Sequence, residues 1–388
     1  MAEPIIIDLS DEHGSKRVVD ELRTHFSTVR RWEFETLLQE GAYGVVVRIK
    51  KKPGLFEGVR RLAVKRALGE GEENQLRNEI KRLKKLRGAE HIVKIVAARD
   101  DTNGTGKNEI NGLETNDGGP ETNIARRRKS RLKLWFASLM RLFKKHADHY
   151  LVGLNGPVIA MEYLENGTFR RLMARAKTHD IHLPNLMLWS LFLCPCVAMA
   201  YPIEAAEGEP NRLETIPKDG RQPSDLYHGD LHVGNLMLGD PGGSFPEHRI
   251  VPVAKFIDFG SRAEMEDGII ANLLKRMLNL IARGDVPVLR CKSTYKGIQT
   301  MATEILPTED GHKYPMLDEE LRDLLVRCLA IQPDNRPRLR EMLQMVETAV
   351  KTKTAGEFAP YHTRETDEAI KNTLQLLVYD ASTTGGIS

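Results

Sequence analysis

The sequence predicts an α+β fold in which an antiparallel sheet forms much of the first part of the chain and helices form most of the second. Two observations predict it. Residues 34–66 alternate between apolar and polar positions, as strands joined by turns do. After Gly167 the pattern becomes mainly helical, apart from a Gly- and Pro-rich loop at 205–225 and short strands around 228–260. A chain of 388 residues is long enough for one two-part domain with extensions.

The other predicted elements of the first part follow in order. Residues 73–86 form an amphipathic helix, because their apolar residues share one face: Leu76, Ile80, Leu83 and Leu86. Strands are predicted at 91–98 and 157–165. Between them, residues 100–124 are rich in Asn, Gly, Thr and acid, which predicts disorder, and residues 125–148 are basic and compatible with a helix.

Composition limits the class of protein. The net charge of +3 includes a basic run between Arg126 and Lys145, so the rest of the chain is net acidic and no sequence-specific nucleic-acid binding is expected.

The four cysteines form no CxxC pair and have no histidine at metal spacing, which favours a reducing compartment and buried free thiols at Cys194 and Cys196. No secretory signal is visible, so a cytoplasmic or nuclear location is expected. The apolar stretch 185–201 predicts a buried core helix rather than a membrane span.

Four short sequence motifs contain residues suited to phosphate binding, proton transfer or metal binding, and they occur one after another along the chain. EGAYGVV at 40–46 lies in a predicted hairpin, where glycines let a backbone approach phosphates closely. AVK at 63–65 is an apolar strand that ends in a lysine. YHGDLHVGNLM at 227–237 can place a proton acceptor and a metal ligand side by side on one loop. KFIDFG at 255–260 ends a strand in an acid, and Asp and Asn oxygens are ligands that Mg²⁺ prefers.

Each string alone is common in proteins, but in this order the four resemble the eukaryotic protein-kinase superfamily. The resemblance covers about residues 34–350 and includes LVRCLAIQPDNRPRLREML at 325–343. It implies a two-lobed fold with ATP in the cleft. It also implies four divisions of the chain. These are an N-terminal extension at 1–33, an N-lobe at 34–164 that contains the inserted segment at about 100–149, a C-lobe at 165–350, and a polar C-terminal tail at 351–388 that is expected to fray.

The resemblance also implies a role for each matching residue, with ATP and Mg²⁺ as cofactors. Lys65 is similar to the lysine that holds the α- and β-phosphates, and Glu79 to the helix glutamate that pairs with it. Asp230 is similar to the catalytic acid/base that orients the acceptor hydroxyl, and Asn235 and Asp258 to the metal ligands. The other nucleotide-binding positions comprise loop glycines, adenine contacts, gatekeeper and hinge: Gly41, Gly44, Val46, Ala63, Met161, Glu162, Leu164 and Met237.

Several positions depart from the family pattern. Gln39 stands at the first loop glycine, Gly229 replaces the arginine before the catalytic aspartate, and His232 replaces a phosphate-assisting lysine. Only residues 261–267 separate the Asp-Phe-Gly string from the next helical pattern, so the activation loop is missing. Its terminal glutamate normally pairs with the arginine found here at Arg336, and Glu264 or Glu266 could substitute.

Three functions therefore stay open. The first is a divergent serine/threonine protein kinase, similar to kinases expanded in filamentous fungi, that transfers the γ-phosphate of ATP to a protein hydroxyl. The second is a kinase of small molecules, because HGDLHVGN is also similar to aminoglycoside- and choline-kinase-like enzymes. The third is a non-catalytic scaffold that binds ATP, or pseudokinase, which the missing activation loop favours.

Two accessory segments suggest partners. In the basic segment 125–148, Leu132, Trp135 or Phe136, Leu139 and Phe143 fall near one helix face, a pattern that suits an anionic membrane or a calmodulin-like groove, and equally a helix packed on the N-lobe. The patch of Ile5, Ile6, Ile7 and Leu9 before acidic residues resembles the motif that binds the small ubiquitin-like modifier; a coincidental strand is the plainer interpretation.

Overall fold

The computed structural model describes residues 9–41, 43–53, 61–100, 148–200, 234–242, 246–259, 281–283, 292–308 and 311–380. The chain divides into two compact units. The described residues of the first unit are those up to Arg87 and from Lys94 to Tyr163; those of the second are 88–93 and all from Leu164 onwards. The fold class is α+β, as predicted, because the first unit contains an antiparallel sheet and the second is mainly helical.

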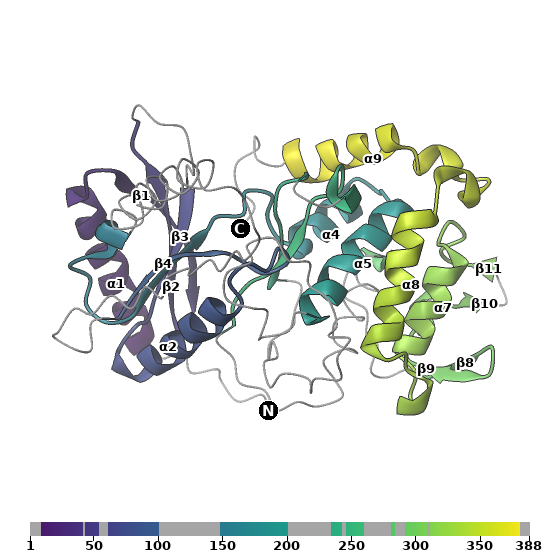
Figure 1. The fold of residues 1–388 in the computed structure, drawn as a ribbon, viewed down its shortest axis with the longest axis horizontal. Helices are drawn as coiled ribbons and strands as arrows, with labels where there is room; N and C mark the ends of the chain where they lie inside the picture. Colours follow the sequence, from purple (N-terminus) through teal and green to yellow (C-terminus); the bar gives the residue numbers. More distant parts are fainter. Residues whose placement is uncertain are drawn as a thin grey trace, which may run out of the picture. The chain divides into compact units, whose positions relative to one another are not determined.

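A five-stranded antiparallel sheet forms the centre of the first unit (Figure 1). Its strands, in spatial order, are β1 (Trp32–Gly41), β2 (Gly44–Lys51), β3 (Arg61–Arg66), β5 (Val158–Glu162) and β4 (Ile95–Arg99). The predicted hairpin and the two later strands are thus confirmed. The alternation of the sequence decides the faces, since Val45, Val47 and Ile49 on β2 are fully buried and the residues between them are half-buried.

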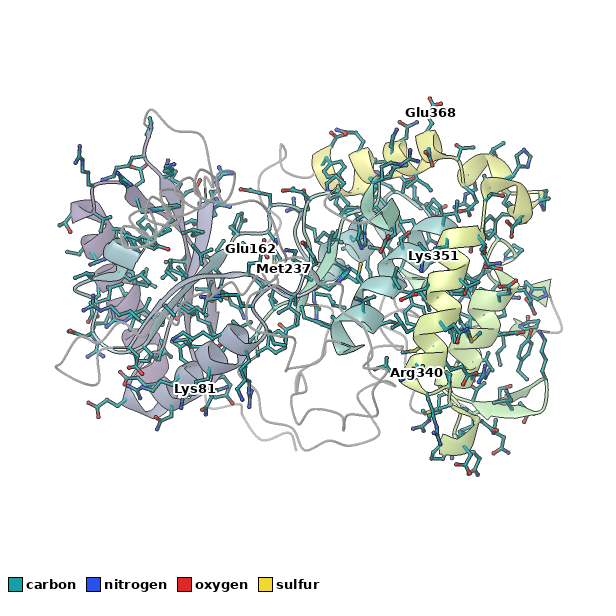
Figure 2. The ribbon with its side chains drawn as sticks, in the orientation of Figure 1. Lys81, Glu162, Met237, Arg340, Lys351 and Glu368 are labelled. Atoms are coloured by element: carbon teal, nitrogen blue, oxygen red, sulfur yellow. The ribbon has the colours of Figure 1, made fainter. Side chains whose placement is uncertain are left out.

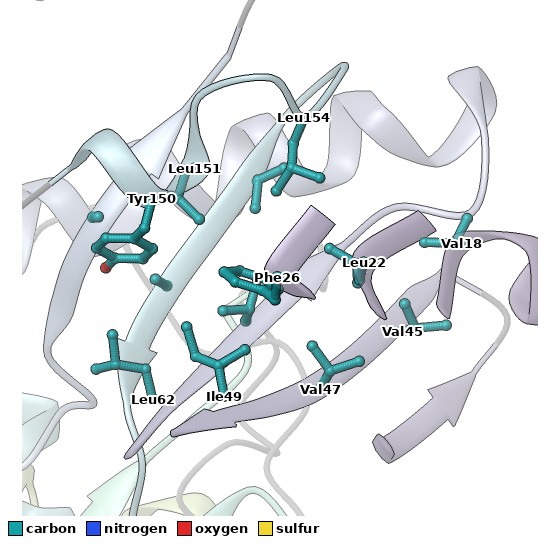
Figure 3. Close-up of a cluster of buried hydrophobic side chains, with 14 of the residues drawn as sticks. Val18, Leu22, Phe26, Val45, Val47, Ile49, Leu62, Tyr150, Leu151 and Leu154 are labelled. Atoms are coloured by element: carbon teal, nitrogen blue, oxygen red, sulfur yellow. The ribbon is translucent and has the colours of Figure 1, made fainter. Parts of the chain in front are cut away.

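A helix covers the fully buried face of this sheet. Residues 1–33 were expected to form an extension, yet α1 (Leu9–Thr28) lies within them and packs on the strands. Its residues Val18, Leu22 and Phe26 are spaced four apart and point into the same cluster as Val47 and Leu62 (Figure 3). The short helix η1 (Asp148–Leu151) adds Tyr150 and Leu151 to this cluster. The first unit therefore has its main hydrophobic core between α1 and the sheet.

The opposite face of the sheet carries α2 (Glu70–Lys85), the predicted amphipathic helix. Three glutamates occupy its first turn and three basic residues its last turn, so its charges complement the helix dipole. The helix buries Leu76, Ile80 and Leu83, while Lys81 on its other side is exposed (Figure 2). Because alternate residues of a strand face opposite ways, the face of β3 that carries Ala63 and Lys65 is the one that meets α2.

The second unit is built around α5 (Asn185–Ala200), which is the predicted buried helix. It packs against α8 (Leu339–Thr352), which buries Met342 and Val346 and exposes Arg340 and Lys351 (Figure 2). The remaining longer helices are α4 (Phe169–Thr178) and α7 (Glu319–Cys328). Two-stranded ladders complete this part: β6 (Leu236–Leu238) with β7 (Ala254–Phe256), β8 (Ser293–Tyr295) with β9 (Ile298–Thr300), and β10 (Pro307–Thr308) with β11 (Gly311–His312). Short 3₁₀ helices connect them: η2 (Pro246–His248), η3 (Thr303–Ile305) and η4 (Pro333–Asn335).

The described residues after 351, as far as Asp380, are folded, contrary to the expected fraying. It forms η5 (Ala355–Phe358), η6 (His362–Arg364), α9 (Asp367–Leu374) and a π-helical turn, η7 (Gln375–Tyr379). The reason is a buried carboxylate. Glu365 is 3% exposed and accepts hydrogen bonds from the backbone N–H groups of Asn185 and Leu186, at 2.8 and 2.9 Å. These donors belong to the first turn of α5, so the tail caps the central helix of this unit.

Several predicted segments lie outside the described residues. These are the polar insertion and the basic segment over 101–147, the patch of Ile5, Ile6 and Ile7, the residues 261–267 and the loop at 205–225. Leu9 itself begins α1. Among the described helices, none combines the length and the apolar character that crossing a membrane requires.

Candidate functional site

An ion pair joins β3 to α2. The ammonium Nζ of Lys65 lies 2.8 Å from Oε2 of Glu79. The Glu79 side chain is 1% exposed and the Lys65 side chain 15%, so both charges are largely withdrawn from water. Glu79 is buried because it lies on the same side of α2 as Leu76, Ile80 and Leu83, at spacings of three, one and four residues. A buried carboxylate requires a partner of opposite charge, and Lys65 supplies it. The predicted pair is thus formed in the structure.

Three of the predicted adenine-contacting residues share one face of the sheet with Lys65. Val46 pairs directly with Lys65 across β2 and β3, and Ala63 pairs with Met161 across β3 and β5. Directly paired residues of neighbouring strands point to the same face, and Ala63 and Lys65 are two positions apart on one strand. The face therefore combines a cation with small and apolar side chains, the composition that a nucleotide with a flat base and anionic phosphates requires.

The two predicted loop glycines have different surroundings. Gly41 and Gly44 pair at the end of the β1–β2 hairpin, with Tyr43 61% exposed between them. A Cβ atom on Gly44 would lie 2.5 Å from the carbonyl oxygen of Arg66, so glycine is required for β2 to approach β3. A Cβ atom on Gly41 would meet nothing within 4 Å. Packing thus explains Gly44, whereas the space beside Gly41 is open to a ligand. The hydroxyl of Ser15 on α1 donates a hydrogen bond to the carboxylate of Glu40 and fixes the strand next to this loop.

The second unit brings the two predicted metal ligands to one end of a strand pair. Asn235 immediately precedes β6, and Asp258 follows β7 by two residues. Because β6 and β7 are antiparallel, the start of one strand lies beside the end of the other, and the N–H of Ile257 donates to the carbonyl of Asn235 at 3.0 Å. Asn235 is 6% exposed and Asp258 is half-buried.

Asp258 adopts an unusual backbone conformation. Its φ is 61°, in the left-handed region that costs most residues about 1–2 kcal/mol and that aspartate enters more readily than most. Among the described residues, the other non-glycine positions with positive φ are Asp180, Arg283 and Lys296, and each of these lies in a turn. Asp258 does not. Strained conformations outside turns concentrate at functional sites, because the surrounding structure must hold them in place.

The predicted hinge residues divide between the units. The Glu162 N–H donates to the carbonyl of Lys94 at 3.0 Å, and the Glu162 carboxylate accepts the N–H of Lys94 at 2.8 Å. Leu164 is buried in the second unit, 3.8 Å from the position that a Cβ atom on Gly239 would occupy. Met237 lies in β6 opposite Lys255 and is half-buried. The described backbone thus joins Glu162 to the sheet of the first unit and Met237 to the ladder of the second.

Some predicted residues are not described. Asp230, Gly229 and His232 lie outside the described residues, as do Glu264 and Glu266. Arg336, which was expected to pair with a glutamate, donates to the backbone carbonyls of Ala330 and Ile331 at 2.8 and 3.4 Å. In the described structure these bonds hold the turn between α7 and α8.

A second cluster of chemistry-bearing side chains lies in the second unit: His91, Cys194 and His248. His91 Nε2 and His248 Nε2 are 3.2 Å apart, and Cys194 Sγ is 3.7 Å from His248 Nε2. Burial alone would raise the pKa of the Cys194 thiol, but the neighbouring imidazole of His248 opposes this and lowers the pKa to about 6. The pKa of His248 is lowered by its burial and raised by the Cys194 sulfur, with a net rise.

Sequence reasoning predicted the burial of Cys194 and missed this cluster. The two histidines are 157 residues apart and His248 is 54 residues from Cys194, so no local spacing reveals them. By contrast, Cys196, two residues along the same helix, is buried, and its pKa is raised by burial.

The described residues of the predicted phosphate and metal site thus fall into two groups, one in each unit. The first contains Lys65, Glu79 and the sheet face beside them; the second contains Asn235 and Asp258. No protein-family model matches the chain, and no curated protein matches its sequence. The function proposed below therefore rests on the chain's own residues.

The two glycines of the hairpin give a matched test. We expect Gly44→Ala to lower the stability of the first unit by about 1–3 kcal/mol, because the new methyl group overlaps the Arg66 carbonyl and the strands must separate. Gly41→Ala should change stability by less than about 0.5 kcal/mol, since its methyl group meets no atom of the protein. Urea unfolding followed by circular dichroism measures both. Equal losses for the two variants would show that the hairpin does not approach β3 as described.

Proposed function

We propose that the chain is an ATP-dependent phosphotransferase with a protein-kinase-like fold, and that it transfers the γ-phosphate of ATP to a protein serine or threonine hydroxyl. The observation that carries the proposal is the buried pair of Lys65 and Glu79. An ion pair this deeply buried gains little net stability over apolar packing, so a role in ligand binding is a better reason for its presence than stability. Its place on a sheet face with Val46 and Ala63 supports a nucleotide as the ligand.

Lys65 would bind the phosphates. Phosphoryl transfer requires mainly that the phosphates be held in line and their charge be neutralised. A lysine side chain is long and flexible, and fixing it in one place costs conformational entropy. Glu79, held rigidly by α2, fixes the ammonium at 2.8 Å. The lysine side chain therefore loses its conformational entropy during folding and not during ligand binding. The Gly41 backbone, next to open space, would approach the phosphates from the hairpin.

Asn235 and Asp258 fit a magnesium ion by their chemistry. Both offer hard oxygen ligands, and sites for Mg²⁺ typically use one or two protein ligands together with waters and substrate phosphates. Bound Mg²⁺ supplies positive charge against the phosphate oxygens. The backbone bond between Ile257 and Asn235 keeps the two ligand-bearing segments adjacent, and the left-handed φ of Asp258 sets the direction of its carboxylate.

Asp230 would orient the acceptor hydroxyl and receive its proton, as the resemblance implies. The choice of acceptor rests on sequence resemblance: the string at 325–343 is similar to the late signature of protein kinases, whereas HGDLHVGN is also similar to kinases of small molecules. Protein and small-molecule acceptors are therefore compared in the same assay. A scaffold that binds ATP without transferring phosphate is the remaining alternative.

Binding of Mg·ATP can be measured through its effect on stability. Mg·ATP at a hundredfold excess over its Kd should stabilise the native chain by about 2.7 kcal/mol and raise the melting temperature. Lys65→Met and Asp258→Ala should each remove about half of the shift or more, because one loses the phosphate contact and the other a metal ligand. Lys81→Met, at an exposed site on α2, is the matched control and should keep the full shift. An unchanged melting temperature of the wild type in Mg·ATP would contradict the ATP site.

A variant at Asp230 separates an enzyme from a scaffold. Asp230→Asn should bind Mg·ATP as tightly as the wild type but transfer phosphate at least about 100-fold more slowly, because the resemblance implies that this aspartate acts on the acceptor hydroxyl rather than on the nucleotide. The measurement is transfer of labelled γ-phosphate to the chain itself, to a basic protein and to an aminoglycoside. If wild type binds Mg·ATP, transfers to none of them and matches Asp230→Asn, the scaffold function replaces the kinase.

A further inference from the structure

Three buried side chains of the second unit converge from separate segments. His91 belongs to residues 88–93, Cys194 to the middle of α5, and His248 to the end of η2. They are 2%, 0% and 0% exposed, and their nitrogen and sulfur atoms all lie within 4.8 Å of one another. We propose that these three residues bind a zinc ion that holds the three segments together. None of the three belongs to the residues proposed for phosphotransfer, and the inference does not rest on that function.

Two of the three separations between the ligand atoms match those around a tetrahedral ion. Zinc binds imidazole nitrogen at about 2.0–2.1 Å and thiolate sulfur at about 2.3 Å, so tetrahedral angles place two nitrogens about 3.3 Å apart and a nitrogen and a sulfur about 3.6 Å apart. The two histidine nitrogens are 3.2 Å apart, and Cys194 Sγ is 3.7 Å from His248 Nε2. A direct N–H···N hydrogen bond between the rings would be near the long end of its usual range.

The second nitrogen of His248 orients the ring for metal binding. Nδ1 lies 3.3 Å from the carbonyl oxygen of Val251. A carbonyl only accepts, so Nδ1 carries the proton and a neutral ring presents its lone pair at Nε2, toward His91 and Cys194. Histidine ligands of zinc are commonly held in this way, by an outer hydrogen bond to a carbonyl or carboxylate.

The sulfur of Cys194 has a partner that suits a thiolate. The backbone N–H of Ala254 donates to Sγ at 3.3 Å, and such a donor stabilises negative charge on sulfur. In the thiol form, the S–H can instead donate to the carbonyl of Ser190, which is 3.4 Å away. Zinc binding replaces this weak bond and releases the thiol proton.

The donor set selects the class of metal. Thiolate and imidazole prefer zinc and copper, whereas Mg²⁺ prefers oxygen ligands, so this site and the pair of Asn235 and Asp258 would not compete for one ion. Among the described residues no fourth His, Cys, Asp or Glu joins the group. The carbonyl of His91 accepts the N–H of Phe256 at 2.9 Å, so the ion would also support β7, the strand that leads to Asp258.

The test uses the full-length chain without an affinity tag. Purified wild type should contain about one zinc per chain by elemental analysis, and removal by a chelator should lower the melting temperature until zinc is restored. Cobalt(II) loaded in place of zinc should give the visible bands of a tetrahedral site and a thiolate-to-cobalt charge-transfer band. The wild-type protein tests the proposal without any variant. If cobalt gives no thiolate band and zinc does not change the melting temperature, the three residues form only a hydrogen-bonded cluster and the proposal is overturned.

Matched serine variants then identify the ligand. Cys194→Ser should lose the charge-transfer band and weaken zinc binding by more than the roughly 10–100-fold that loss of an outer partner costs. Cys196→Ser, a buried thiol on the same helix, should keep both, and circular dichroism establishes that each variant is folded. A thiolate band that survives in Cys194→Ser would place the metal on another cysteine and contradict the site.

Discussion

The contact between Lys65 and Glu79 sets the arrangement of the first unit. Removing one member of a buried ion pair typically costs 3–5 kcal/mol, because the remaining charge is stranded away from water. The pair therefore fixes the position of α2 along β3 as well as its rotation about its own axis. Burial of Leu76, Ile80 and Leu83 holds the helix on the sheet, but hydrophobic contact is non-directional and would tolerate a shift that a 2.8 Å contact does not.

The two faces of the five-stranded sheet have different roles. One face packs Val47, Ile49 and Leu62 against α1 and provides hydrophobic stability. The other keeps Val46, Ala63 and Lys65 half-buried, and so retains surface that a ligand can cover. The contact between Ser15 and Glu40, together with the 2.7 Å ion pair of Arg66 with Glu21, connects α1 to the strands that bear the glycine hairpin and the lysine. Segments outside the candidate site thereby support its geometry.

The sequence predicted those features that depend on local periodicity and missed those that depend on distant contacts. The hairpin, α2 and α5 follow from alternation and helical spacing, and the Lys65–Glu79 pair was implied by the family resemblance. The four-residue spacing of Val18, Leu22 and Phe26 is a helical signal, but residues 1–33 were predicted only as a polar extension. The folded tail depends on Glu365 meeting α5 from 180 residues away, and the site of His91, Cys194 and His248 depends on three separate segments. No pattern within a short window contains such information.

The central claim is that Lys65 contacts phosphate. Isothermal titration of wild type and Lys65→Met with ATP, ADP and adenosine tests it directly, because adenosine has the same base and sugar but no phosphate. We expect Lys65→Met to bind ATP and ADP about tenfold or more weakly and adenosine with unchanged affinity, in line with the loss of one charge-assisted contact. An equal loss for all three ligands, or no loss for ATP, would mean that Lys65 serves only to neutralise Glu79, and would contradict the account.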